Sequence, residues 1–273
     1  MDREPAIDIE RAIDAFVAGW TRVRRITHPY IAERIEGVWI ARDQPAHPRN
    51  TRNEEFITHG LAPAVVDRIA RENAMRRYKI SVIRAASEPE APLRAAYRSL
   101  GYRLLGTEGL FVHTLRRIAA APASSTADSA SSTAAPTSSA PSAPVEISRV
   151  TTPEQAAAVA KAARKRQLLP GHLNDPSPAI RLYAAMDGAH VAGWVSSVTA
   201  GAAAWCANLF VEPSYRRQGI GRALMTRVLH EDRERGFTAS VLLASHAGAL
   251  LYPGLGYQRI GELCLFGPAP AAR

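Results

Sequence analysis

The stretch that decides the fold reads NLFVEPSYRRQGIGRAL and covers residues 208–224. It opens as a strand that Glu212 and Pro213 end, and from Gly219 onward apolar residues recur every four positions, as in a helix. Glycines at 219 and 221 let the backbone turn tightly and bring its N–H groups close to a ligand. Because the first N–H groups of a helix are unpaired and its dipole attracts anions, the stretch predicts a strand–loop–helix step that can bind a phosphate.

Three arginines surround these glycines and could pair with a phosphate: Arg216, Arg217 and Arg222. The same composition also fits a plain surface turn before an amphipathic helix. The commoner phosphate loops are excluded, because no lysine follows the second glycine and no third glycine stands at Rossmann spacing.

The residues around this step predict a mixed α/β or α+β unit. Periodicity and turn signals predict its strands at 145–150, 181–186, 191–199, 203–211, 238–244 and 257–266. They predict its helices at 153–166, from 219 to about 236, and at 246–252.

A segment of different composition divides the chain. Residues 119–144 contain 10 Ala, 8 Ser, 3 Thr, 4 Pro and one Asp, and no large apolar side chain, so they cannot offset the entropy of ordering. We therefore expect an N-terminal unit at 1–117, a flexible linker at 118–145 and a C-terminal unit at 146–273. Each unit is large enough to fold alone.

The net charge of +9 raises the question of a polyanionic partner. Residues 1–117 carry 20 Lys and Arg against 15 Asp and Glu, and residues 146–273 carry 14 against 9, so the excess is spread evenly. We therefore expect no nucleic-acid and no membrane partner. The chain has no apolar run long enough to span a bilayer and no signal-peptide pattern, which predicts a cytoplasmic location. Cys206 and Cys264 are expected to be buried free thiols, and no metal-ligand spacing is present.

Two segments of the C-terminal unit resemble motifs of one family. Arg216-x-x-Gly219-x-Gly221, preceded by Leu209-x-Val211-x-Pro213-x-Tyr215, is similar to the acyl-CoA pyrophosphate motif of the GNAT superfamily of acyl-CoA-dependent N-acyltransferases. Residues 250–257, LLYPGLGY, resemble that family's Leu-Tyr-x-x-Leu-Gly-Phe segment. The resemblance covers nearly all of 146–267 and implies a GNAT-like, mostly antiparallel mixed sheet flanked by helices.

The resemblance also implies site residues. The backbone of Leu209, Phe210 and Val211 would pair with the pantetheine arm of acetyl-CoA. The pyrophosphate would be bound by the loop that comprises Arg216, Arg217, Gln218, Gly219, Ile220, Gly221 and Arg222. Ser245 would lie near the pantetheine, or else simply cap the next helix. Tyr252 would protonate the departing thiolate, because a neutral phenol can act as a general acid.

These residues imply an N-acetyltransferase in which a small-molecule or peptide amine attacks the thioester directly. Many family members place a glutamate on the strand before the loop, but residues 203–208 contain no carboxylate. The base could be a water held by carbonyls, a histidine such as His172 or His246, or solvent. The missing carboxylate keeps open a second function, that of a non-catalytic acyl-CoA-binding regulatory module.

The N-terminal unit is expected to be a degenerate copy of the same fold. Tyr97, Leu100, Gly101 and Tyr102 repeat the spacing of the 252–257 segment. Between the strand predicted at 54–58 and the helix predicted from 62, however, only three residues stand where the glycine loop belongs. We therefore expect this unit to have lost cofactor binding, with Tyr97 structural. Three uses stay open for it: covering a sheet edge, shaping the acceptor cleft, or forming a homodimer.

Overall fold

The computed structural model describes residues 7–45, 52–118 and 145–270. The linker predicted for 118–145 lies outside these residues except for its two ends. Secondary structure in the N-terminal unit comprises α1 (Ile9–Arg25), β1 (Tyr30–Ile35), β2 (Val38–Asp43), β3 (Glu54–His59), α2 (Pro63–Asn73), β4 (Tyr78–Ala85), α3 (Glu90–Ser99) and β5 (Tyr102–His113).

Apart from α5 and the short η1 and η2, the C-terminal unit follows the order that the sequence predicts. It comprises β6 (Glu146–Arg149), α4 (Pro153–Ala162), α5 (Pro170–Asn174), β7 (Ile180–Asp187), β8 (His190–Ala200), β9 (Ala203–Val211), η1 (Pro213–Tyr215), α6 (Ile220–Glu234), β10 (Ala239–Ala244), α7 (His246–Ala249), η2 (Pro253–Leu255) and β11 (Gln258–Pro268). The capping box at Thr152 and Gln155 begins α4. The helix expected at 246–252 is only one turn of α7 before η2 begins.

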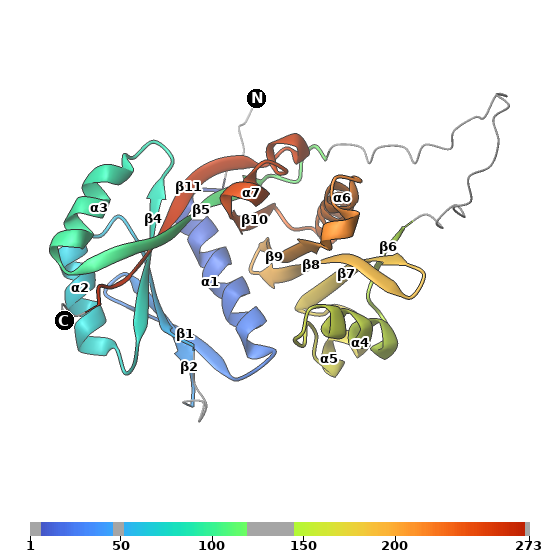
Figure 1. Ribbon diagram of the computed structural model, residues 1–273, viewed down its shortest axis with the longest axis horizontal. Coiled ribbons are helices and arrows are strands. Elements are labelled where there is room, and N and C mark those ends of the chain that lie inside the picture. The colour runs from blue at the N-terminus through green and yellow to red at the C-terminus, as the bar shows by residue number, and fades with distance from the viewer. Residues whose placement is uncertain (1–6, 46–51, 119–144, 271–273) are drawn as a thin grey trace, which may run out of the picture.

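All eleven strands of the described residues form one sheet, in the order β1-β2-β3-β4-β11-β5-β10-β9-β8-β7-β6. Only the pairs β3–β4 and β9–β10 are parallel. The last strands of the two units are exchanged: β11 pairs with β4, and β5 pairs with β10. β5 and β11 also pair with each other and cross the middle of the molecule (Figure 1). Each unit thus completes its sheet with a strand of the other, which the sequence does not predict.

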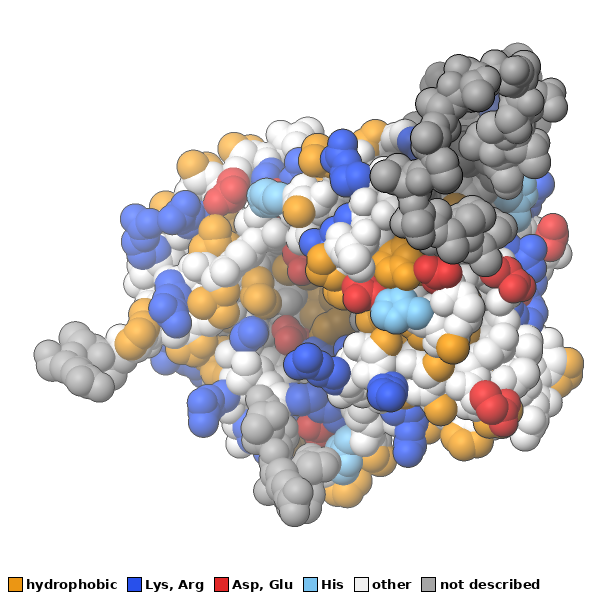
Figure 2. Space-filling view, turned by 45° about the vertical axis from the view of Figure 1, so that its right-hand side comes forward, with side chains coloured by type: hydrophobic (Ala, Val, Ile, Leu, Met, Phe, Trp, Pro, Cys, Tyr) orange, Lys and Arg blue, Asp and Glu red, His pale blue; other side chains and the backbone are white. Residues whose placement is uncertain are grey.

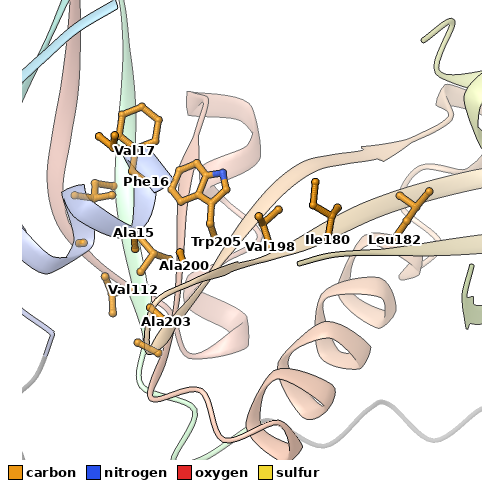
Figure 3. Packing of buried hydrophobic residues seen from close by; sticks show 14 of the residues in the cluster. Ala15, Phe16, Val17, Val112, Ile180, Leu182, Val198, Ala200, Ala203 and Trp205 are labelled. Atoms are coloured by element: carbon orange, nitrogen blue, oxygen red, sulfur yellow. The ribbon is translucent and has the colours of Figure 1, made fainter. Parts of the chain in front are cut away.

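Three apolar clusters cover the two faces of this sheet. On one face, α2 and α3 pack on the N-terminal unit and α6 and α7 on the C-terminal unit. On the other face, α1 and α4 share one cluster with strands of both units. Helix α1 lies in the crease between the units (Figure 1), where the Phe16 ring meets Trp205 of β9 at 5.1 Å between centroids (Figure 3). The core is therefore continuous across the boundary between the units.

Helix α1, like β1 and α5, is an element that the sequence analysis did not predict. Asp8 caps it by accepting a hydrogen bond from the Arg11 N–H. A Cβ on Gly19 would lie 2.3 Å from the Trp205 side chain, so only glycine allows α1 to approach β9 this closely. Both cysteines are buried and free, as predicted.

Candidate active site

A slot opens in the sheet where β9 leaves β10. The two strands pair only from Ala203 to Trp205 of β9, although both continue beyond that point. The register against β8 shifts between Trp194 and Ser196, and Asn208 has a φ of 58°, as expected for a β-bulge. Residues 203–206 are buried, whereas 207–211 are half-buried or exposed. Leu209, Phe210 and Val211 thus lie on a strand edge that β10 does not cover.

The corresponding strands of the N-terminal unit show no such slot. β3 pairs with β4 along its whole length, from Glu54 to His59. Only residues 60–62 connect β3 to α2, which leaves no room for a glycine loop. This geometry agrees with the expected degenerate copy.

The loop after β9 ends at an uncapped helix. Arg217 and Gly219 both have positive φ, 66° and 81°, and α6 begins at Ile220. No side chain caps its first N–H groups, which remain available to an anion. A Cβ on Gly219 would meet nothing within 4 Å, so this residue borders open space. The loop therefore has the backbone geometry of a phosphate site.

Three polar side chains of this loop donate hydrogen bonds to backbone carbonyl groups. Arg216 Nε donates to the Val211 carbonyl at 3.0 Å, and Gln218 Nε2 donates to the Ser214 carbonyl at 3.1 Å. Arg222 Nη1 donates to the Gly254 carbonyl at 2.9 Å, which ties α6 to η2. Arg217 is exposed. Arg216 and Arg222 thus hold the loop in place and also add positive charge beside it.

A second set of contacts fixes the loop to the β7–β8 turn. The Tyr215 hydroxyl donates to Asp187 at 2.7 Å, and its ring stacks on His190 at 5.5 Å. His190 also pairs with Glu212, the residue that ends β9. These contacts tie the start of the loop to the β7–β8 turn.

Tyr252 lies in the apolar cluster that lines the slot. The cluster includes Leu242 and Ala244 of β10, and Leu209 and Val211 pack against it. The Tyr252 side chain is 6% exposed, and its hydroxyl makes no hydrogen bond to any described residue. Burial raises the pKa of this phenol above its usual value, so it stays protonated at neutral pH. A phenol that stays protonated retains the proton that a general acid donates.

The other polar candidates have structural partners. Ser245 Oγ accepts from the Gly248 N–H at 3.3 Å and caps α7, as in the second of its two expected roles. His172 Nδ1 accepts from the Leu169 N–H at 3.2 Å, and burial lowers its pKa. His246 Nε2 lies 3.4 Å from Thr107 Oγ1 of β5. No carboxylate lies on β9 or β10.

Sequence reasoning missed the contribution of β5 to this site. Gly109 of β5 pairs with Ala244, at the end of β10 where the slot is open. The Phe111 ring then meets Tyr252 at 5.7 Å between centroids. The repeat of 97–102 in 252–257 shows that the strands which follow it, β5 and β11, are related. It does not show which strand each of them pairs with.

A groove of about 1410 Å³ lies elsewhere, along α1 and the β8–β9 turn at residues 200–203. Figure 2 shows a hollow in the molecular surface with apolar side chains on its floor and both basic and acidic side chains around it. The described residues contain no group of three His, Cys, Asp or Glu side chains able to hold a metal ion. In the same ranges, no helix is both long and apolar enough to cross a membrane.

Comparisons with known proteins agree with this geometry. A GCN5-related N-acetyltransferase from Kribbella flavida has the same fold over 98% of each chain, at 16% identity and a TM-score of 0.59. Another from Sphaerobacter thermophilus covers 86% of this chain and 78% of its own, at 19% identity and a TM-score of 0.53. A search of curated proteins finds no match. The family model described as an acetyltransferase (GNAT) domain matches residues 178–259, from β7 to the start of β11. Residues 178–259 are thus similar to an acetyltransferase (GNAT) domain, in line with the resemblance seen in the sequence.

Proposed function

We propose that this protein transfers an acetyl group from acetyl-CoA to a primary amine of a small molecule or peptide. The observation that carries the proposal is the divergence of β9 from β10 beside the uncapped start of α6. The free edge of β9 can pair with the amides of a pantetheine arm, and the α6 N-terminus can bind the pyrophosphate. The cytoplasm, expected from the sequence, is the proposed location.

The reaction needs one nucleophile and one acid. The unprotonated amine attacks the thioester carbonyl carbon, a C–N bond forms and the C–S bond breaks. A backbone N–H near Val211 polarises the carbonyl, and the Tyr252 hydroxyl gives its proton to the thiolate. The proton that the amine loses passes to solvent, which returns one to Tyr252. No metal is needed for these steps.

Replacing Tyr252 tests the acid role. We expect Tyr252→Phe to lower kcat by about 100-fold or more while the Kd for acetyl-CoA changes little, because only a proton donor is lost. Thiol release with a panel of amines measures kcat, and calorimetry measures Kd. Tyr97→Phe, at the repeated position in the N-terminal unit, is the matched control and should leave kcat unchanged. An unaltered kcat in Tyr252→Phe would rule out the acid role.

The alternative function, a non-catalytic acyl-CoA-binding module, is favoured by the lack of a carboxylate on β9 and β10. The same assay separates the two. Acetyl-CoA binding without thiol release for any amine supports the module, and no binding contradicts both functions.

A further inference from the structure

The two units place a tyrosine and a phenylalanine together in the same way. Tyr97 and Tyr252 occupy equivalent positions of the internal repeat. Tyr97 lies within α3, and Tyr252 directly precedes η2. Phe111 in β5 and Phe266 in β11 are likewise equivalent, since each stands nine positions after the tyrosine that ends its repeat. Because the last strands are exchanged, each tyrosine packs on the phenylalanine of the other unit. The centroids lie 5.7 Å apart for Tyr252 and Phe111 and 4.4 Å apart for Tyr97 and Phe266.

Only one of these pairs borders a slot. Tyr97 is fully buried, and its hydroxyl is enclosed without a partner. Its unit has β3 and β4 paired throughout. Tyr252 keeps some exposure and belongs to the cluster that lines the gap between β9 and β10. The Tyr97–Phe266 pair therefore has packing as its only visible task, whereas the Tyr252–Phe111 pair belongs to the cluster beside the gap between β9 and β10.

Few other contacts could orient the Tyr252 ring. Its hydroxyl has no hydrogen bond within the described chain, so packing alone sets its direction. Tyr257 meets the ring edge-on at 5.5 Å, and Phe111 lies on another side at 5.7 Å. Phe111 is itself 4% exposed and held by a strand paired on both edges, with β10 and with β11. Because β5 is paired on both of its edges, the backbone of Phe111 is held firmly and its ring gives Tyr252 a fixed packing partner.

We propose that Phe111 is a positioning residue for Tyr252, so that the N-terminal unit supplies part of the transferase site through β5. The inference rests on the proposed function. The N-terminal unit then has a role in the reaction, because its strand β5 forms a wall of the slot in the C-terminal unit. Phe111 touches neither reacting atom; it acts by fixing where the Tyr252 hydroxyl points.

Phe111 also helps keep water from the phenol. Burial is the main cause of the raised pKa of Tyr252. The titratable groups around it are Cys206 of β9 and Tyr257, and burial raises the pKa of both, so each stays neutral through the pH range of an assay. Removing the Phe111 ring should therefore lower the pKa of Tyr252 toward its ordinary value.

The experiment compares Phe111→Leu with Phe266→Leu in the full chain. Both variants lose a buried ring from an exchanged strand, so both should lower Tm. Only Phe111→Leu should lower kcat, by about 10- to 100-fold, with the KM and Kd for acetyl-CoA within about twofold of the wild type. Phe111→Tyr keeps the ring and should restore most of kcat.

Two outcomes contradict the inference: a normal kcat in Phe111→Leu, or an equal loss of kcat in Phe266→Leu. If Phe111→Leu does not fold, Phe111→Met provides the same comparison with a longer apolar side chain. The proposed function fails separately, because it requires acetyl-CoA turnover by the wild-type protein. Turnover by the wild type together with a normal Phe111→Leu refutes only the role of Phe111.

Discussion

At the scale of single residues, Glu55 of β3 is a buried carboxyl with a strongly raised pKa. Burial raises its pKa to about 7, and the charge of Glu108 adds to the shift. Lys79, Arg24 and a hydrogen bond from Ser81 Oγ at 3.3 Å act in the opposite direction. The folded state therefore holds this proton more tightly than the unfolded state, in which a glutamate titrates near its ordinary value.

This difference predicts how stability depends on pH. The contribution of Glu55 is fully present below the unfolded pKa and is lost as pH rises through about 7, by up to roughly 3 kcal/mol. Glu55→Gln removes the titration, so we expect its Tm to fall less than that of the wild type between pH 5 and pH 8. Thermal melts at both pH values measure this. Glu72→Gln, at an exposed position of α2, should keep the wild-type slope. A wild-type slope in Glu55→Gln would contradict the assignment.

At the scale of elements, the loop after β9 was predicted from the sequence because its cause is local. Gly219 has a φ of 81°, and α6 starts one residue later, as the pattern indicates. Helix α1 also has a local signal, since Ile13, Phe16, Val17 and Trp20 follow helical spacing. The exchange of β5 and β11 has no such signal, because strand neighbours are chosen by contacts far apart in the chain. Phe111 was missed for that reason.

The same loop allows a charge test at one position. Gly219 borders open space, so a longer side chain costs only the left-handed backbone, about 1–2 kcal/mol. Gly219→Glu places a carboxylate beside the proposed pyrophosphate site, whereas Gly219→Gln has the same shape and backbone strain without the charge. We expect Gly219→Glu to bind acetyl-CoA at least 10-fold more weakly than Gly219→Gln, with similar Tm values. Equal affinities in calorimetry would show that the pyrophosphate binds elsewhere.

At the scale of the whole molecule, the two units are joined by more than the chain that links them. The sequence suggests that each could fold alone, since each has ordinary domain length. The strand pairing in the sheet indicates instead that each unit depends on the other. Without residues 7–118, β10 loses its β5 partner and β11 loses both of its neighbours. Trp205 also loses Phe16 of α1, which covers it from the other side of the crease (Figure 3).

We therefore expect residues 145–273, produced alone, to show no cooperative thermal unfolding and no stabilisation by acetyl-CoA. An unpaired β10 edge and the apolar face left by α1 would instead favour aggregation. Co-expression with residues 1–118 as a separate chain should restore both properties, because the exchanged strands and the shared core need proximity and not a covalent link. Size-exclusion chromatography should show the two pieces together in equal amounts, and circular dichroism should show one joint melt. A C-terminal piece that melts cooperatively and binds acetyl-CoA by itself would mean that β5 only covers an edge, and the N-terminal unit would then have no necessary part in the site.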